Sequence, residues 1–317
     1  MAQLVYAAAA SHTAQLVRTP DKLAQVQRDA VYSGLEQIRL NLENSRPDVL
    51  VVFGADHFQS FHLDNMPTFC IGIGKDTETF GDAGVPLARY PMHESFAHHL
   101  AGAVLGAGID VATSRRLRLD HAFASPLHFV LPQADIPLVP IVINSIAAPL
   151  APLQRSYLLG RAVAVAISSW SGDLRVAVLG TGGLSHWVPI PHPDHPRDGS
   201  DAEIIEQMIS GQDDPSRMTR LLLPRIARAS DAGDAHIGED FDREVIALLA
   251  SGRASELAQR STSWVDEHGG GGGQEIRNWL AVAGASADSP ATLLAYEPVV
   301  PWLTGIAMME WDMGHPA

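Results

Sequence analysis

Cysteine is almost absent from this chain of 317 residues, since Cys70 is the only one. A single cysteine excludes an intrachain disulfide framework. Cys70 lies in the apolar stretch 69–73. We therefore expect a buried, unreactive thiol there and not a nucleophile.

Basic residues are also scarce, because 22 Lys and Arg stand against 36 Asp and Glu and leave a net charge of −14. Binding to a nucleic-acid backbone requires clusters of Lys and Arg that displace counterions, so we expect no nucleic-acid partner. Anionic small molecules stay open as substrates, because a local arginine or a metal ion can override the overall charge.

Long hydrophobic runs are missing as well. No apolar stretch approaches the roughly 20 residues of a transmembrane helix, and the apolar residues 4–10 follow no basic leader. We expect residues 4–10 to form a buried strand, and we expect a cytoplasmic enzyme without a membrane partner. Hydrophobic residues make up 46% of the chain, which is enough for a substantial core.

Short runs rich in Val, Ile, Leu and Ala alternate with longer segments of helical periodicity. Strands are predicted near 3–9, 49–54, 69–73, 138–143, 174–180 and 294–298, and helices near 22–43, 92–107, 152–169, 201–210, 240–251 and 275–284. The alternation indicates an α/β fold. We predict a single-domain sandwich over residues 1–317, with a central mixed sheet covered by helices on both faces.

Two segments depart from this pattern. Residues 190–238 are rich in Pro, Asp, Arg and Ser and are predicted to form a lid or an excursion from the sheet. Residues 269–273 are five consecutive glycines, which predict a break before the last helix and no contribution to the core.

Three of the predicted strands are followed within a few residues by a histidine. His12 follows residues 4–10, His57 follows 49–53 and His186 follows 176–179. In α/β proteins, ligands and reacting groups gather at the carboxyl ends of the strands. Three imidazoles at one edge of a sheet therefore predict a metal site or an acid–base site.

Two further residues are candidates for the same site. His121 follows Asp120, and an adjacent aspartate could orient the imidazole; the same Asp-His pair recurs at Asp56-His57. Glu275 follows the glycine run closely and could supply the carboxylate of a ferrous site with two imidazoles. By position alone, Glu275 could equally be a first-turn glutamate that complements the helix dipole.

Six blocks of residues, in this order, carry a resemblance to a known family. The chain resembles the class III extradiol ring-cleavage dioxygenases, the superfamily of the protocatechuate 4,5-dioxygenase beta subunit and 2,3-dihydroxyphenylpropionate 1,2-dioxygenase. The resemblance covers most of the chain and is loose over 190–260. The blocks are Ser11-His12, Asp56-His57-Phe58, 66–72, 120–127, 179–186 and 274–279.

The resemblance implies that His12, His57 and Glu275 hold Fe(II), with His121 and His186 as acid–base groups beside it. It also directs attention to Thr13, because residues 13–15 differ from the sequence common in the family next to the first histidine. Thr304 lies in a region, with Trp302 and Leu303, that contacts the substrate's substituent in some relatives. Trp302 could instead be a core aromatic.

The implied reaction is extradiol (meta) cleavage of a substituted catechol by O2, giving a product of the 2-hydroxymuconic semialdehyde type. A zinc-dependent hydrolase would use the same two histidines and glutamate, and a non-catalytic scaffold relative would have lost one of the five site residues. We expect a homo-oligomer, since family members commonly assemble, and a small accessory subunit stays open.

Overall fold

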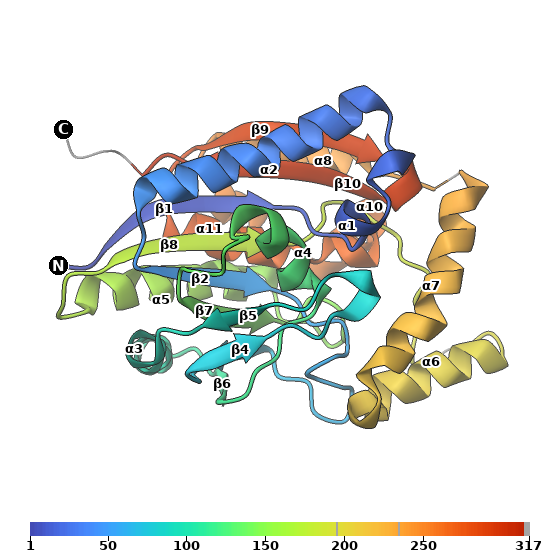
Figure 1. Ribbon diagram of the computed structural model, residues 1–317, viewed down its shortest axis with the longest axis horizontal. Helices are drawn as coiled ribbons and strands as arrows, with labels where there is room; N and C mark the ends of the chain where they lie inside the picture. The colour runs from blue at the N-terminus through green and yellow to red at the C-terminus, as the bar shows by residue number, and fades with distance from the viewer. Residues whose placement is uncertain (195, 234, 314–317) are drawn as a thin grey trace.

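The computed structural model describes residues 1–194, 196–233 and 235–313. Within these residues, the main sheet has eight strands in the order β6-β3-β7-β2-β8-β1-β10-β9. The central strands β7, β2, β8 and β1 run parallel, whereas β3, β10 and β9 pair antiparallel with their neighbours β7, β1 and β10. The sheet is therefore mixed, as predicted (Figure 1). The strands are β1 (Gln3–Ala10), β2 (Val49–Gly54), β3 (Phe69–Gly72), β6 (Ala112–Ser114), β7 (Leu138–Ile143), β8 (Arg175–Thr181), β9 (Ala291–Val299) and β10 (Thr304–Trp311), with β4 (Asp76–Glu78) and β5 (Arg89–Pro91) forming a separate hairpin.

Helices cover both faces of this sheet. The helices are α1 (Gln15–Arg18), α2 (Gln25–Ser45), α3 (Glu94–Gly106), α4 (His121–Val130), α5 (Leu153–Ser169), α6 (Gly199–Ser210), α7 (Pro215–Ala232), α8 (Glu239–Ala250), α9 (Ala254–Leu257), α10 (Thr262–Gly273) and α11 (Ile276–Ala285). Short 3-10 turns are η1 (Pro20–Lys22), η2 (Asp82–Gly84), η3 (Gly211–Asp213) and η4 (Val300–Trp302). Helices α2 and α4 share one core cluster, and α3, α5, α8 and α11 share the other.

The buried central strand β2 shows how one strand supplies both clusters. Val49, Val51 and Phe53 belong to the cluster on one face, and Leu50 and Val52 belong to the cluster on the other. Successive side chains of a strand point to opposite faces of a sheet. A continuously apolar strand therefore fits a sheet that is covered on both sides.

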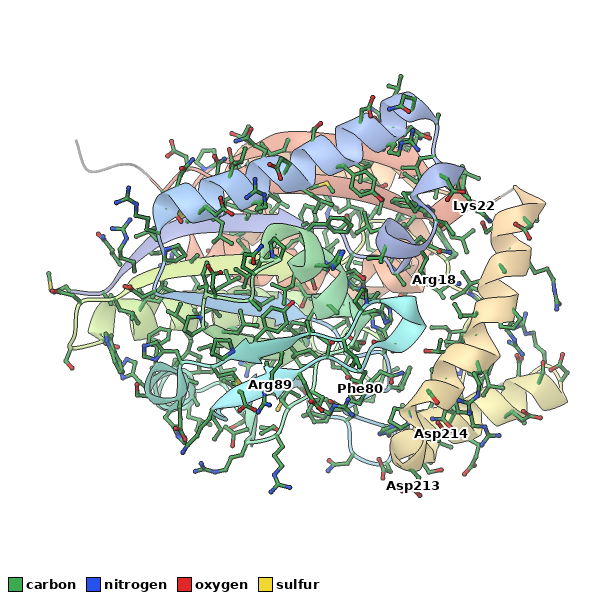
Figure 2. All side chains as sticks on the ribbon, in the orientation of Figure 1. Arg18, Lys22, Phe80, Arg89, Asp213 and Asp214 are labelled. Atoms are coloured by element: carbon green, nitrogen blue, oxygen red, sulfur yellow. The ribbon has the colours of Figure 1, made fainter. Side chains whose placement is uncertain are left out.

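Helices α6 and α7 lie outside the body formed by the main sheet and the helices on its two faces. Figure 1 shows them at the end of the sheet where β1, β2 and β8 stop. A small apolar cluster that includes Phe58, Ile204, Met208 and Met218 packs them against the body. Polar contacts add to this: the Lys22 ammonium of η1 reaches α7 and lies 3.0 Å from Asp231 (Figure 2). The described part of residues 190–238 thus forms a helical excursion, and its action as a lid stays a prediction.

The six predicted strands and six predicted helices are all present, within a few residues of their predicted ends. Cys70 is buried, as expected, and burial raises the pKa of its thiol to about 12. The prediction for the five glycines is wrong in part. Gly269–Gly273 forms the last turn of α10, with a kink at Gly270, and three of the five glycines are buried. Over residues 1–194, 196–233 and 235–313, no helix combines the length and apolar character needed to cross a bilayer.

Candidate active site

Three parallel strands deliver three histidines to one edge of the sheet. His12 follows β1, His57 follows β2 and His186 follows β8, and these strands are direct neighbours in the order β2-β8-β1. The carboxyl ends of these three strands therefore lie side by side, as the sequence predicts. Side-chain exposure is 3% for His12, 18% for His57 and 12% for His186, so each ring is largely buried.

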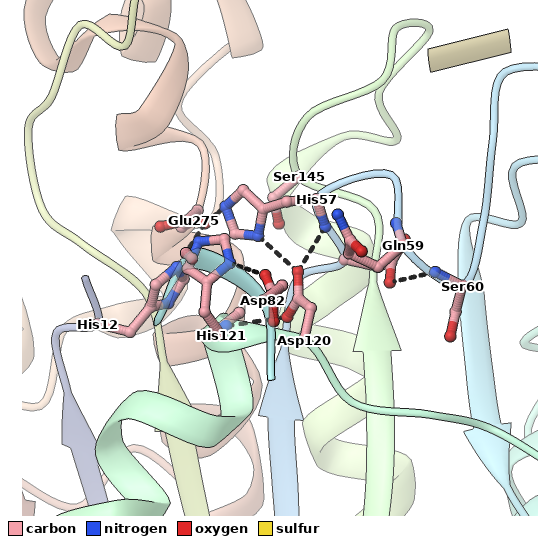
Figure 3. A network of polar contacts seen from close by, with 12 residues as sticks. His12, His57, Gln59, Ser60, Asp82, Asp120, His121, Ser145 and Glu275 are labelled. Atoms are coloured by element: carbon pink, nitrogen blue, oxygen red, sulfur yellow. Dashed lines mark hydrogen bonds and ion pairs between the residues drawn. The ribbon is translucent and has the colours of Figure 1, made fainter. Parts of the chain in front are cut away.

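The other two candidate residues arrive from helix N-termini. His121 is the first residue of α4, and the carboxylate of the preceding Asp120 caps this helix by accepting from the Ala122 N–H. Glu275 immediately precedes α11 and is 1% exposed. Figure 3 shows His12, His57, His121 and Glu275 converging.

The Glu275 carboxylate lies at the centre of the cluster. Its Oε1 is 3.4 Å from Nε2 of His12 and 3.3 Å from Nε2 of His57, and its Oε2 is 3.9 Å from Nε2 of His186. Oε2 accepts a hydrogen bond of 2.8 Å from the Gly183 N–H. Oε1 is buried and has no hydrogen-bond partner among the described residues.

A glycine lets the strand-end backbone approach Glu275 this closely. Gly182, directly after β8, has a φ of +130°, which L side chains rarely adopt. A Cβ atom at Gly182 would also lie 2.8 Å from the Cβ of Glu275. The position of the glutamate therefore requires a glycine at 182.

Two aspartates orient two of the histidines, in a pairing that differs from the prediction. Asp120 Oδ2 contacts Nδ1 of His57 at 2.8 Å and also accepts from the His57 backbone N–H at 2.7 Å. His121 instead pairs through Nδ1 with Asp82 Oδ2 at 2.6 Å. Asp56 contacts neither imidazole and accepts hydrogen bonds from the backbone N–H groups of residues 59–61. Adjacency in sequence therefore identified the wrong partner in both Asp-His pairs.

The pKa values of His12, His57 and His186 are shifted in different directions. Burial lowers the pKa of His12 to about 3, and burial also lowers the pKa of His186. Burial opposes the charged form of His57 too, but the Asp120 carboxylate and Glu275 outweigh it and hold the pKa of His57 well above its usual value. Burial acts to raise the pKa of Glu275, yet His12, His57 and His186 hold this pKa well below its usual value. The cluster thus keeps an ionised carboxylate among imidazoles.

The glycine run, residues 269–273, packs against His186 and fixes its position. The His186 N–H donates to the Gly269 carbonyl at 2.9 Å, and the Gly272 N–H donates to the His186 carbonyl at 3.1 Å. A Cβ atom at Gly272 would overlap Cδ2 and Nε2 of the His186 ring. A Cβ atom at Gly271, by contrast, would meet nothing within 4 Å. Close approach of the imidazole therefore explains why the run contains Gly272.

A cavity of about 130 Å³ opens above the cluster and is lined by His12, His57, His121 and His186. Thr13 and Thr304, the weaker substrate-binding candidates, line it too. Trp302 also lines this cavity, although it is 3% exposed and belongs to a core cluster. Both interpretations of Trp302 therefore describe part of its environment.

The donor set fits a divalent transition metal. Two imidazoles and one carboxylate that leave open positions are typical of non-haem Fe(II) oxygenases. The buried Oε1 of Glu275, without a hydrogen bond and beside two imidazole nitrogens, is the position that a cation would satisfy. The contact between His57 Nδ1 and Asp120 matches the carboxylate backing common for metal-bound histidines. Ligand atoms of His12, His57 and His121 also lie within 4.8 Å of one another, so His121 borders the same space.

Sequence reasoning missed two residues of this network. Asp82 belongs to η2 and binds His121, but the two residues are 39 positions apart and no motif joins them. Asp242, on α8, accepts from both the N–H and the hydroxyl of Ser185, the neighbour of His186. Asp242 is one of four acidic residues on this helix, so the sequence did not distinguish it from its neighbours.

Curated relatives match the chain over most of its length. The chain is 35% identical over 273 residues to a 2,3-dihydroxyphenylpropionate/2,3-dihydroxicinnamic acid 1,2-dioxygenase of Cupriavidus necator, covering 83% of this chain and 85% of the relative. It is 36% identical over 283 residues to the enzyme of that name from Paraburkholderia xenovorans (strain LB400), covering 86% and 87%. The corresponding enzyme of Rhodococcus jostii (strain RHA1) is 32% identical over 298 residues, with 90% and 91% covered.

A solved structure and a family model extend these similarities. An uncharacterized protein from Escherichia coli K12 superposes with a TM-score of 0.53 at 15% identity, covering 97% of this chain and 100% of that one, which supports the fold alone. The family model described as the catalytic LigB subunit of aromatic ring-opening dioxygenase matches residues 6–306. With this match and the curated relatives, the chain belongs to the LigB family and is an aromatic ring-opening dioxygenase.

Proposed function

We propose that this enzyme uses Fe(II), held by His12, His57 and Glu275, to cleave a substituted catechol next to its diol. Both atoms of O2 enter the product, so a catechol plus one O2 balances a product of the 2-hydroxymuconic semialdehyde type. The observation that carries the proposal is the buried Oε1 of Glu275, which lacks a hydrogen bond and lies between the Nε2 atoms of His12 and His57.

The bound ferrous ion would supply open coordination positions for the two diol oxygens and for dioxygen. The protein's own part is to hold the ligands in place before substrate arrives. Asp120 does this for His57 by contacting its Nδ1 and its backbone N–H. The Gly183 N–H does it for Glu275 by binding Oε2, which leaves Oε1 directed at the two imidazoles.

His186 and His121 are the proposed acid–base pair. Burial keeps the pKa of His186 low, so its ring is neutral near pH 7 and can accept a proton from the diol at Nε2. Its Nδ1 lies 3.1 Å from the Leu184 carbonyl, which fits a proton on Nδ1 and a free Nε2. His121 contacts Asp82 through Nδ1, so Nε2 is the atom left to exchange a proton with the ring or its oxygens.

Water exclusion is the proposed task of residues 190–238. Ile190 and side chains of α7 line the cavity, together with Val188 just before this segment. Their apolar surface removes water from the space in which dioxygen chemistry takes place.

The test is reconstitution of the metal-free protein with Fe(II) under anaerobic conditions, followed by addition of oxygen and a panel of catechols. We expect oxygen uptake and a yellow product with Fe(II), and neither with Zn(II). Zinc-supported hydrolysis of an ester or amide panel without oxygen uptake would overturn the proposal.

A further inference from the structure

The wall of the cavity opposite the histidines is almost entirely hydrocarbon. Helix α7 contributes Met218, Leu222, Leu223 and Ile226, and the segment before α6 contributes Val188 and Ile190. Thr219 also lines the cavity, and its hydroxyl oxygen accepts a hydrogen bond of 3.2 Å from the Ala83 N–H, so the polar group of this wall is a single uncharged hydroxyl. This wall therefore offers a ligand little except apolar contact.

Part of this apolar surface has no other partner. Leu223, Ile226 and Val188 are only half-buried and belong to no hydrophobic core cluster of the described residues. Leu221 and Leu222, by contrast, pack on the cluster around Phe58 and Met208. Leu223 and Ile226 thus give α7 an apolar surface toward the cavity that no core cluster of the described residues requires.

Lysine and arginine are nearly absent from the cavity. Arg18 is the only lysine or arginine among its described lining residues, and its side chain is exposed. Figure 2 shows Arg18 at the end of α1, on the side of the body that faces α7. An exposed ion pair contributes little, and the net charge of −14 repels anions further. A carboxylate held against the α7 wall would lose its hydration without gaining a buried counterion.

We propose that the preferred substrate is a catechol whose ring substituent is an uncharged hydrocarbon, bound against Leu222, Leu223 and Ile226. This inference rests on the proposed function and deepens it. The cavity of about 130 Å³ is close to the ~150 Å³ of an engineered apolar cavity that takes up benzene, so one ring fills its enclosed part. The substituent then extends along α7.

The first experiment compares 3-butylcatechol with 2,3-dihydroxyphenylpropionate, which has a similar length but ends in a carboxylate. We expect kcat/KM of the ferrous enzyme to be at least about tenfold higher for 3-butylcatechol, because the carboxylate is desolvated without a partner. Anaerobic titration of the ferrous enzyme should likewise give a lower Kd for 3-butylcatechol than for the acid. Preference for the acid, especially one that Arg18→Gln abolishes, would overturn the inference.

The second experiment places a cation in the wall. Ile226→Lys should reverse the preference by raising kcat/KM for the acid and lowering it for 3-butylcatechol. Ala227→Lys is the matched control, because Ala227 is exposed on the same helix and does not line the cavity. Equal effects of the two substitutions would contradict a specific role for the wall.

A milder variant covers the case in which Ile226→Lys does not fold. Leu223→Ala should lower kcat/KM for 3-butylcatechol by about fourfold or more, since each buried methylene counts for roughly that factor, and leave unsubstituted catechol nearly unaffected. An equal loss for both substrates would contradict the inference.

Failure of the inference and failure of the proposed function give different results. Absence of oxygen uptake with every catechol would overturn the proposed function, while the anaerobic Kd values would still test the wall. Oxygen uptake with a preference for the acid would leave the proposed function standing and remove the inference.

Discussion

Glu275 has the most constrained side chain of the candidate site. It is 1% exposed, one oxygen is bound to the Gly183 N–H, and the other faces two imidazoles. Position alone was equally compatible with a glutamate that complements a helix dipole. Burial among imidazoles favours the proposed site role, because an ionised carboxylate is buried only when charge or hydrogen bonds compensate it.

The five site residues are predicted to separate into two groups upon substitution. Glu275→Ala or His57→Ala should abolish retention of Fe(II), because each removes one of the three proposed ligands. His186→Ala should retain Fe(II) and lose about 10²–10⁴-fold in turnover, the usual contribution of a general acid–base group. Metal analysis and oxygen uptake measure the two properties separately.

His128→Ala is the control for this series, because His128 lies exposed on α4, the helix that begins with His121. It should change neither property. Near-normal turnover of His186→Ala would contradict the acid–base assignment, and full metal content in Glu275→Ala would contradict the ligand set.

His186 depends on a residue without a side chain. Gly272→Ala would place a methyl group on the imidazole, so the ring must leave its position. We expect Gly272→Ala to retain Fe(II) and to lose turnover nearly as severely as His186→Ala. The measurement is oxygen uptake at equal metal content.

Gly271→Ala supplies the matched control, one residue away in the same glycine run. A Cβ atom there meets nothing within 4 Å, so turnover should stay at the wild-type level. If both variants lost turnover equally, the loss would come from helix geometry and not from contact with His186.

At the scale of elements, helix α8 fastens the strand end that carries His186. Asp242 accepts hydrogen bonds of 2.7 and 3.0 Å from the N–H and hydroxyl of Ser185, and one of 2.9 Å from the Tyr296 hydroxyl of β9. The Ser185 hydroxyl in turn accepts from the Gly238 N–H. One buried carboxylate therefore links α8, β9 and the segment after β8.

Asp242 should also leave a signature in the pH dependence of stability. Burial raises its pKa to about 6, despite the hydrogen bonds from Ser185 and Tyr296. Between pH 4 and 6 the folded protein keeps a proton that the unfolded chain has released, so the contribution of Asp242 to the free energy of unfolding falls as the pH rises. Between pH 4 and pH 7, the free energy of unfolding of Asp242→Asn should rise by on the order of 3 kcal/mol relative to that of wild type.

Denaturant unfolding of the metal-free proteins at a series of pH values measures this difference. Asp240→Asn alters an exposed carboxylate on the same helix. Its free energy of unfolding should change with pH as that of wild type does. A constant difference between wild type and Asp242→Asn across this range would show that Asp242 is ionised throughout.

Elements with a regular pattern could be predicted from the sequence, and those with interrupted patterns could not. The prediction omitted α4 and α7, which contain Pro126 and Pro224 inside the helix, where proline removes a backbone hydrogen bond. It also omitted β10, whose place is set by pairing with β1 and β9 from distant parts of the chain. Strand-end histidines were visible because they depend only on local order along the chain.

The partners of those histidines depend on the third dimension. Asp120 binds His57, 63 residues away, whereas its neighbour His121 binds Asp82 of η2. The hydrogen bonds of the His186 backbone likewise join the segment after β8 to the end of α10. Spacing in the sequence has no information on such contacts.

For the whole molecule, the central feature is that neighbouring parallel strands end together. The order β2-β8-β1 brings His57, His186 and His12 to one edge, and α11 brings Glu275 beneath them. Relatives named as dioxygenases align along nearly the whole chain, in agreement with a site assembled from distant segments.

The mass of the product tests the central claim most directly. Ferrous enzyme, a catechol and oxygen should yield a yellow product whose mass equals that of the substrate plus one dioxygen molecule, with one O2 consumed per catechol. A product lacking two hydrogens would indicate oxidation to a quinone, and a product heavier by one water would indicate hydrolysis. Either result would contradict ring cleavage at this site.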